Sequence, residues 1–433
     1  MLSNSKRKIP MRKQIINSLL ALMLTGVSAV NCYGADKGSV YYLNYKPESD
    51  AAWQELAKVY TEKTGIPVKI ETVANSQYTD VLNAKMNDTD APTLFQLHGN
   101  ASSEEMEKNC FNLTNSKVYK ELSEKSYVLR DSRKRICGIA YAVETYGIIV
   151  NKELLAKAGY TVDDIESFED LKAVAEDITA RKNELGFSAF TSAGLNETSD
   201  WRFRTHLSNM PIYYEYQKKN VKSLNKIEGL YLNNYKAIWD LYINNSTCKP
   251  EELKNKGIED SRNEFVSQKA VFYQNGSWDY NELMNNGMNK FKLAMIPLYV
   301  GAENEEFQGL CTGTDNYWCV NRNASFTDIK ATLEFINWCV TSKEGTEAMA
   351  HKMGFFIPFD NAAYSENIFI QNNVIYTATG KLPVTWDFTT IPNRNWKLNI
   401  SAALANLAEG CRRICKSVVI LSGFSQLRTV KNY

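Results

Sequence analysis

The sequence contains very few histidines and lacks the common motifs for phosphate binding and for nucleophilic catalysis. Three histidines occur among 433 residues, His98, His206 and His351, and none stands at the spacing of metal ligands, so a zinc site is not expected. Neither G-x-x-x-x-G-K-[ST] nor G-x-G-x-x-G is present, which argues against a nucleotide-binding loop. The nucleophile motif G-x-S-x-G is also missing. We therefore expect a protein without a metal or another cofactor.

Long apolar runs are absent after the first thirty-odd residues. At the start, five basic residues precede an apolar stretch from Leu19 to Val30 that small residues follow. This order is typical of a secretory signal and too short for a membrane span, so we predict a signal peptide over residues 1–34 and an exported, extracellular protein. Cys32 lies where a lipid could be attached, although Asn31 before it fits the usual lipidation pattern poorly.

An excess of positive charge is missing as well. Loss of the five basic residues of the leader takes the net charge from +1 to about −4, and five more basic residues lie in the last 23 positions. The body of the chain, 36–410, is therefore near −9. This balance argues against nucleic acid as a partner.

Nine cysteines in an exported chain raise the question of disulfides, and no C-x-x-C occurs. The neighbours in sequence are Cys110 with Cys137 and Cys311 with Cys319. The alternative is that these residues are free buried thiols.

Hydrophobic periodicity predicts an α/β protein. From residue 39 to 97 the pattern alternates strand, helix, strand, helix, strand, which indicates a parallel sheet with helical crossovers. A long β-prone run covers 138–150, and capping boxes are predicted at Ser167–Asp170 and Ser261–Glu264. The pattern from 327 to 340 is helical, and residues 341–410 suggest short helices and loops. The length indicates two or three domains, and no flexible linker separates them.

The segment 271–280, VFYQNGSWDY, places an amide, a glycine and an indole at the end of an apolar strand. In open α/β sheets ligands bind at such strand ends. The glycine allows close approach of a ligand, and Trp278 offers a flat apolar face with one hydrogen-bond donor. The alternative is an ordinary strand–turn–helix corner with a core tryptophan.

Six segments of this kind combine aromatic rings with amides, hydroxyls or carboxylates after a β run. They are 44–48, 96–100, 144–146, 275–278, 313–318 and 382–386. Ring faces beside uncharged polar groups suit a sugar better than a phosphate or a peptide. Trp53 and Trp239 are expected in the core, and Trp201 fits either role.

Paired carboxylates for glycoside hydrolysis form the alternative from another class of function. Asp279, Asp315 and Glu144 are the candidates, since many acidic pairs in a folded chain reach the required separation. The alternative, which the sequence favours, is that they accept hydrogen bonds from ligand hydroxyls or cap helices. A secreted glycan-cleaving hydrolase therefore stays open beside a sugar receptor.

The order of several short sequence motifs in this chain resembles that in the extracellular sugar-binding proteins of ABC importers, the maltose-binding-like group. The resemblance rests on five phrases along 38–410: Ala91–Phe95, Tyr146–Gly159, Ser167–Leu171, Asn275–Trp278 and Asp315–Trp318. It implies a bilobal fold with two α/β lobes joined by crossing hinge segments, and an oligosaccharide bound between them. It also implies delivery to the transmembrane subunits of a permease, no enzymatic activity and a monomer.

The resemblance further implies lobe boundaries and site residues. Lobe one would be 36–144 with 313–353, and lobe two 146–311 with 354–410. The expected ligand contacts are Trp278, Asn275, Asp315, Trp318, Glu144, Glu48, His98 and Trp386. The tail 411–433 departs from the family, because it is basic, has no acid and shows no clear helical stripe.

Overall fold

The computed structural model describes residues 37–99, 101–224, 226–391 and 395–408. The predicted signal peptide with Cys32, and the tail 411–433, lie outside these residues. Among the described helices, none combines the length and apolar character needed to cross a membrane.

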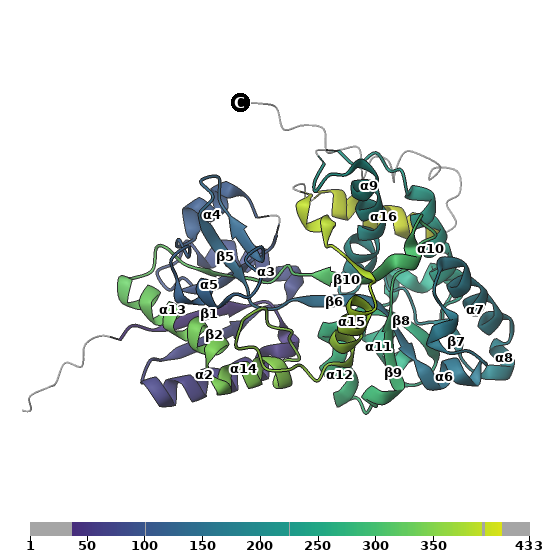
Figure 1. The fold of residues 1–433 in the computed structure, drawn as a ribbon, viewed down its shortest axis with the longest axis horizontal. Helices are drawn as coiled ribbons and strands as arrows, with labels where there is room; N and C mark the ends of the chain where they lie inside the picture. Colours follow the sequence, from purple (N-terminus) through teal and green to yellow (C-terminus); the bar gives the residue numbers. More distant parts are fainter. Residues whose placement is uncertain (1–36, 100, 225, 392–394, 409–433) are drawn as a thin grey trace, which may run out of the picture. The chain divides into compact units, whose positions relative to one another are not determined.

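The first sheet confirms the parallel unit predicted at the start of the fold. Its strands run in the order β2-β1-β3-β11-β5-β4, and β1 pairs in parallel with both β2 and β3 (Figure 1). The bounds are β1 (Val40–Asn44), β2 (Val68–Thr72), β3 (Leu94–Leu97), β4 (Val128–Arg130), β5 (Ile136–Ala140) and β11 (Tyr317–Val320). Strand β11 comes from much later in the chain and lies antiparallel between β3 and β5.

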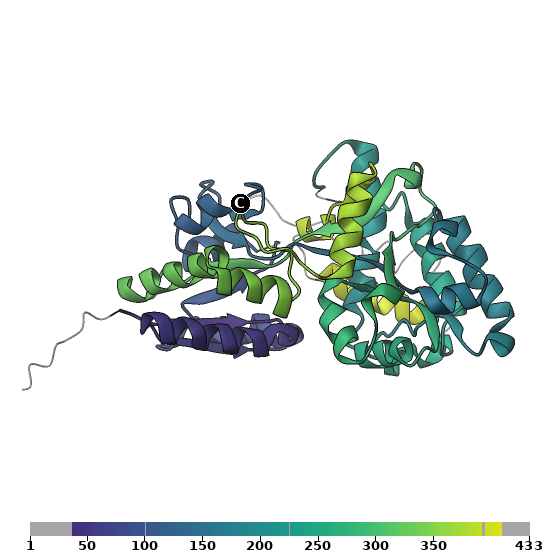
Figure 2. The same ribbon diagram turned by 60° about the horizontal axis from the view of Figure 1, so that its bottom comes forward.

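Amphipathic helices cover this sheet, as the periodicity predicts. Helix α2 buries Trp53, Leu56, Ala57 and Tyr60, and it ends at Gly65, whose φ of 71° suits glycine. Helices α2 and α13 pack on strands of the sheet (Figure 2). The helices of this part are α2 (Asp50–Thr64), α3 (Asn75–Lys85), α4 (Ser103–Asn109), α5 (Lys117–Glu121), α13 (Phe326–Thr341) and α14 (Lys343–Glu347).

The second sheet has the order β12-β10-β6-β8-β7, with β9 also paired to β6. Its strands are β6 (Glu144–Asn151), β7 (Ser188–Phe190), β8 (Ala270–Gly276), β9 (Leu293–Ile296), β10 (Gln308–Gly313) and β12 (Leu382–Val384). Strand β6 lies at its centre, because it pairs with β8, β9 and β10. Gly147 permits this crowding, since a Cβ there would stand 2.3 Å from the carbonyl oxygen of Ile296.

The helices of the second part are α6 (Lys152–Lys157), α7 (Phe168–Ala180), α8 (Lys182–Leu185), α9 (Asn209–Lys219), α10 (Leu232–Asn244), α11 (Ile258–Val266), α12 (Tyr280–Asn285), α15 (Ile368–Ala378) and α16 (Asn395–Ala408). The Ser167 cap of α7 is confirmed, because its side chain accepts a hydrogen bond from the Asp170 N–H. The Ser261 cap is wrong. Helix α11 begins earlier, where the Asp260 carboxylate accepts from Gly257 N–H, and Ser261 lies inside the helix.

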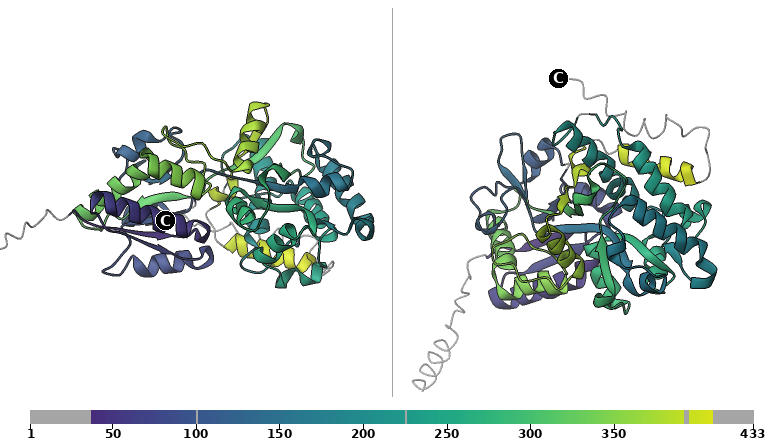
Figure 3. Two further views of the ribbon diagram at one scale, coloured as in Figure 1. Left: turned by 90° about the horizontal axis from the view of Figure 1, so that it is seen from below. Right: turned by 45° about the vertical axis from the view of Figure 1, so that its right-hand side comes forward.

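Two other predictions need correction. The run 138–150 is two strands, β5 and β6, which belong to different sheets and are separated by Tyr141–Val143. Residues 354–408 hold two full helices, α15 and α16, and the edge strand β12 rather than short helices and loops. Helix α15 packs on β10, and α16 packs on the helical turn η3 (Arg202–Leu207) (Figure 3).

The chain passes from one sheet to the other three times: between β5 and β6, between β10 and β11, and between α14 and α15. The first and third passages touch, because Val143 and Phe356 form an isolated β-bridge. The first and second meet through the pair Glu144 and Gly313. Residues at these passages are therefore held by both sheets.

Candidate functional site

At the end of strand β8, the Trp278 indole packs against Gly276. Trp278 lies in the turn η5 (Ser277–Asp279) and is half-buried. Its Nε1 donates a 2.7 Å hydrogen bond to Asn275 Oδ1, and the Asn275 amide donates to Tyr273 Oη. Asn275 is 2% exposed. Its amide therefore positions the indole, and in this structure it has little surface left for a ligand.

Gly276 provides the room for this ring. A Cβ at Gly276 would lie 2.3 Å from the Trp278 six-membered ring. The sequence prediction assigned this glycine to close approach of a ligand, whereas the structure gives the space to the neighbouring indole. The effect is to fix the direction of the ring face.

Trp386, which comes after the edge strand β12 of the same sheet, joins Trp278. It follows β12 directly, and the two indole centroids lie 6.4 Å apart with ring planes at 87°. A glycine again makes room, because a Cβ at Gly313 would stand 2.7 Å from the Trp386 ring. Trp386 is 7% exposed, and its Nε1–H has no hydrogen-bond partner among the described residues. A buried unpaired donor is costly, so a ligand oxygen at this position would stabilise the site.

Three further rings complete this group, which we call the aromatic cluster: Trp201, His206, Trp278, Trp386 and Tyr146. His206 is central, with centroids 5.0 Å from Trp201, 5.3 Å from Trp278 and 5.6 Å from Trp386. Tyr146 on β6 packs 4.6 Å from His206. From the sequence, Trp201 fitted either role and His206 had no predicted role.

His206 is a neutral polar group within the cluster. Burial lowers the pKa of His206 to about 3, so the ring is uncharged at neutral pH. Its Nδ1 lies 3.0 Å from Thr205 Oγ1 and 3.3 Å from the Trp201 carbonyl oxygen. Because the Thr205 hydroxyl donates to that same carbonyl, both partners of Nδ1 act as acceptors, so the proton lies on Nδ1. The Nε2 atom then carries a lone pair and has no hydrogen-bond partner among the described residues. It can accept a hydrogen bond from a hydroxyl group.

The predicted carboxylates Glu48 and Glu144 lie in a buried ionic group beside the passages between the two sheets. Lys46 Nζ lies 2.8 Å from Glu144 Oε1 and 3.3 Å from Glu48 Oε1. Burial alone would lower the pKa of Lys46, but Glu144 and Glu48 outweigh it and the pKa is raised. Asn316 Nδ2 donates to Glu144 Oε2 at 2.7 Å. Glu144 therefore holds the passages together, while Glu48 keeps 24% of its side chain exposed.

Asp315 and His98 form the second predicted polar pair. His98 Nδ1 lies 3.0 Å from Asp315 Oδ2, and the Gly99 N–H donates to Asp315 Oδ1. Burial would raise the pKa of Asp315, but the attraction of His98 and the bonds to it prevail and lower the pKa. Both side chains keep about a quarter of their surface exposed, 28% and 23%. They remain accessible to a ligand.

Trp318 lies elsewhere. It has no exposed surface, it stacks on Tyr141 at 4.7 Å, and its Nε1 donates to Tyr42 Oη. Register explains this placement, because β11 is inserted between β3 and β5 and its Trp318 side chain falls on the core face. Trp318 therefore offers no ring face to a ligand in this structure.

The carboxylates considered for hydrolysis are each paired with a base. Asp279 is 2% exposed and binds Arg262, at 3.0 Å from Nε, while Glu144 pairs with Lys46 and Asp315 with His98. A general acid for glycoside cleavage needs a raised pKa, whereas that of Asp315 is lowered. The described residues contain no group of three side chains able to hold a metal ion.

The described cysteines are free thiols. The Cys311–Cys319 pair is wrong, because Cys311 on β10 donates to Met210 Sδ in the second part, while Cys319 on β11 lies in the first. Cys110 does have Cys137 as a neighbour, and its thiol also contacts that of Cys319.

The fold matches known proteins. It is similar to the solute-binding protein RafE in complex with raffinose, with a TM-score of 0.72, 15% identity, and 90% of this chain and 100% of that one covered. A chitin oligosaccharide binding protein is similar with a TM-score of 0.72 and 15% identity, over 90% of this chain and 98% of that one. The GacH receptor of Streptomyces glaucescens is similar with a TM-score of 0.68 and 18% identity, over 92% of this chain and 99% of that one. No curated protein sequence matches the chain.

These likenesses confirm the predicted fold class, two α/β lobes in a bilobal solute-binding protein. The family model described as "Bacterial extracellular solute-binding protein" matches residues 55–378. That span includes both sheets except β1 and β12, and it includes Trp278 and His206 of the aromatic cluster. The chain belongs to the bacterial extracellular solute-binding protein family.

Proposed function

We propose that this protein is the receptor of an ABC importer for a neutral carbohydrate, an oligosaccharide, and that it delivers this ligand to a membrane permease. The family provides the solute-binding role. Three structures similar to this chain are named as complexes with raffinose, acarbose and cycloalternan. These ligands are all oligosaccharides, which favours the same class of ligand here.

The observation that carries the proposal is the aromatic cluster. Trp201 and Trp278 are half-exposed rings, and apolar ring faces suit the C–H faces of sugars. The Trp386 N–H is an unpaired donor, and His206 Nε2 is an unpaired acceptor among the described residues. A sugar hydroxyl can accept from the first and donate to the second. The neutral imidazole also avoids a fixed charge at the site.

We further infer that lobe one consists of 36–144 with 313–353, that lobe two consists of 146–311 with 354–410, and that the ligand lies between them. On lobe one, Asp315, His98 and Glu48 retain exposed polar atoms that suit hydroxyl groups. Closure of the two lobes on a ligand would be a hinge motion at the three passages. The mature protein would act as a monomer, either free or tethered through a lipid on Cys32.

Calorimetry with neutral oligosaccharides tests the role of the cluster. Trp278→Ala removes one ring face, and we expect sugar affinity to fall by about 5- to 100-fold, equivalent to about 1–3 kcal/mol. Trp338→Ala is the matched control, because it removes another half-buried indole, which packs on Tyr60 at 5.1 Å in the first part. Equal losses of affinity in both variants, or none in either, would remove Trp278 from the site.

The absence of enzymatic activity is part of the proposal and has its own measurement. The wild-type protein is incubated with end-labelled oligosaccharides that it binds, and the products are separated by chromatography. We expect intact sugar, because the candidate carboxylates are engaged with Arg262, Lys46 and His98. Release of shorter labelled products, lost in Asp315→Asn, would establish the hydrolase instead.

A further inference from the structure

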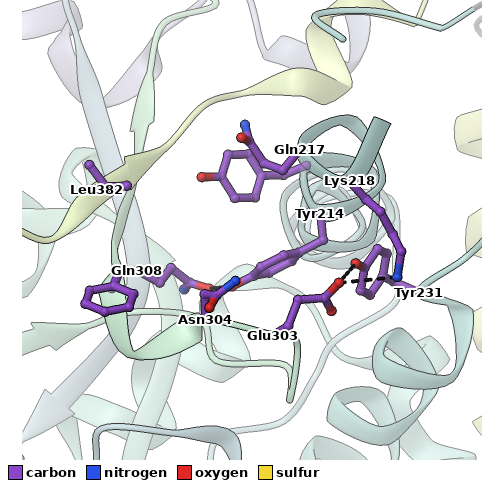
Figure 4. A pocket seen from close by; sticks show the side chains of 10 residues that line it. Tyr214, Gln217, Lys218, Tyr231, Glu303, Asn304, Gln308 and Leu382 are labelled. Carbon is purple, nitrogen blue, oxygen red and sulfur yellow. Dashed lines mark hydrogen bonds and ion pairs between the residues drawn. The ribbon is translucent and has the colours of Figure 1, made fainter. Parts of the chain in front are cut away.

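The second part of the chain contains a hollow that the residues of the aromatic cluster do not line. It is a pocket of about 340 Å³ between helix α9, the segment 303–308 and the edge strand β12 (Figure 4). Its walls include the rings of Tyr213, Tyr214, Tyr231 and Phe307. None of the five members of the aromatic cluster lines it. We call it the tyrosine pocket.

The charges in the tyrosine pocket cancel one another. Lys218 Nζ lies 3.3 Å from Glu303 Oε1, and Tyr231 Oη donates a 2.5 Å hydrogen bond to the same oxygen (Figure 4). The hydrogen bond from Tyr231 is the main cause that lowers the pKa of Glu303, and Lys218 adds to it, so Glu303 stays ionised and paired at neutral pH. The pocket therefore has no uncompensated charge for an ionic ligand.

Uncharged polar groups remain available there. The side-chain amides of Gln217 and Asn304 and the hydroxyl of Tyr213 form no hydrogen bond with any described residue. The Tyr214 hydroxyl, by contrast, donates to Gln308 Oε1 at 2.5 Å, so this residue contributes its ring face only. Asn304 stands in the left-handed region at φ 61°, which is uncommon for a residue other than glycine and holds the loop at the pocket edge.

The rim is apolar and exposed. Phe307 keeps 56% of its surface exposed and Leu382 keeps 62%. A ligand in the pocket would cover part of both side chains, and burial of apolar surface favours binding. Ring faces, free amides and a neutral charge balance together describe a polyhydroxylated neutral molecule, and the volume lies at the lower end for small-ligand sites.

We propose that the tyrosine pocket is a second carbohydrate site, which takes a neutral saccharide of one or two rings. It is independent of the aromatic cluster, and it does not require that the cluster bind sugar. The amides of Gln217 and Asn304 serve the hydroxyl groups, while Tyr213 and Phe307 contact the apolar faces of the rings.

Saturation-transfer NMR on the full mature chain tests the proposal, with maltose, lactose, sucrose and N,N′-diacetylchitobiose as probes. The background is Trp278→Ala, which weakens the aromatic cluster. We expect saturable binding of at least one probe, and its affinity to fall at least tenfold when Phe307→Ala is added. Phe326→Ala is the control, because this phenylalanine is 82% exposed and belongs to α13 in the first part. That variant should leave binding unchanged.

Two outcomes overturn the proposal. One is no saturable binding of any of the four probes in the Trp278→Ala background. The other is binding that Phe307→Ala leaves unchanged while Tm confirms that the variant is folded. Gln217→Ala is the second variant, since this exposed side chain bears little on folding, and it should weaken binding by about three- to tenfold through loss of one hydrogen bond. If the aromatic cluster bound no sugar, wild type and Trp278→Ala would behave alike, so the two proposals fail in distinguishable ways.

Discussion

At the scale of single residues, two tryptophans are placed by the glycines beside them. Gly276 and Gly313 each give up the volume of a side chain to an indole, of Trp278 and Trp386 respectively. For Trp278 the sequence shows the glycine two positions before the tryptophan but not which group fills the space, and Gly313 lies far from Trp386 in the sequence. The sequence therefore predicted Trp278 and Trp386 as site residues without their common orientation, and it assigned Asn275 to the ligand rather than to the indole N–H.

The unpaired N–H of Trp386 leads to the first prediction. Trp386→Phe keeps an aromatic ring but removes this donor, so we expect sugar affinity to fall about 3- to 10-fold, or about 1 kcal/mol. Trp239→Phe is the matched control, because its Nε1 is also buried without a partner among the described residues, yet it lies in the core against Phe203. Calorimetry on both variants decides, and a loss of affinity shared by both would contradict the prediction.

Asp387, next to Trp386, gives a pH-dependent prediction. Burial raises the pKa of Asp387 from 3.8 to about 6, against a lowering by the bond from Thr385. The protonated form is thus favoured in the folded state, and the resulting stability is fully present below about pH 4 and is lost as pH rises through 6. Asp387→Asn should therefore raise the unfolding free energy at pH 8 by up to about 2–3 kcal/mol, with a higher Tm. At pH 4 both quantities should change little.

Thermal unfolding from pH 4 to pH 8 checks this sign. Asp360→Asn serves as the control, because this carboxylate is exposed and the substitution should not alter the shape of the profile. A gain for Asp387→Asn that is the same at pH 4 and pH 8 would mean that the charge of Asp387 is not its cause.

At the scale of elements, the sequence predicted helices and strands where one face is buried and failed where both faces carry apolar residues. Helix α2 has a single apolar stripe and ends at Gly65, and the sequence predicted it correctly. Helix α15 buries Phe369 and Ile370 but exposes Val374 and Ile375, so no stripe marks it. Trp318 shows a further limit, because its burial depends on the strands that flank β11, and those come from distant parts of the chain.

Three elements bring three thiols together, which yields a prediction on disulfides. Cys110 ends α4, Cys137 lies on β5 and Cys319 on β11, and all are buried. Burial raises the pKa of the Cys319 thiol, and the neighbouring Cys110 thiol raises it further. In protein exported through an oxidising compartment, we expect a Cys110–Cys319 disulfide, formed by exchange with a disulfide oxidant that is reduced to two thiols.

Mass spectrometry of unreduced peptides identifies the bonded pair. A reductant should lower Tm by several degrees, because the bond constrains the unfolded chain. Cys110→Ala should abolish this sensitivity, and Cys137→Ala should preserve it. If Cys137→Ala abolished the sensitivity to reductant instead, the bonded pair would be Cys110–Cys137, which the sequence also offered. Cys339→Ala, at a remote buried thiol, is the control.

At the scale of the whole molecule, the two sheets share a buried ion pair at the passages between them. Lys46 follows β1 of the first sheet, and Glu144 begins β6 of the second. The side chains of both are at most 7% exposed, and their charged atoms lie 2.8 Å apart. The family resemblance predicted Glu144 as a ligand contact at a lobe boundary but gave Lys46 no role, since nothing local indicates that residues 98 positions apart meet.

Removal of one partner should be far more damaging here than at the surface. Lys46→Met leaves Glu144 buried with Asn316 as its one side-chain hydrogen-bond donor among the described residues, and we expect a loss of about 3–5 kcal/mol in unfolding free energy. Lys69→Met is the matched control, because its pair with Asp90 has a similar distance of 3.2 Å but is exposed, and such pairs contribute less than about 1 kcal/mol. Denaturant titration measures both. The double variant Lys46→Met with Glu144→Gln should recover part of the loss, because it removes the unpaired charge. Similar small losses in both single variants would show that the pair does not hold the two sheets together.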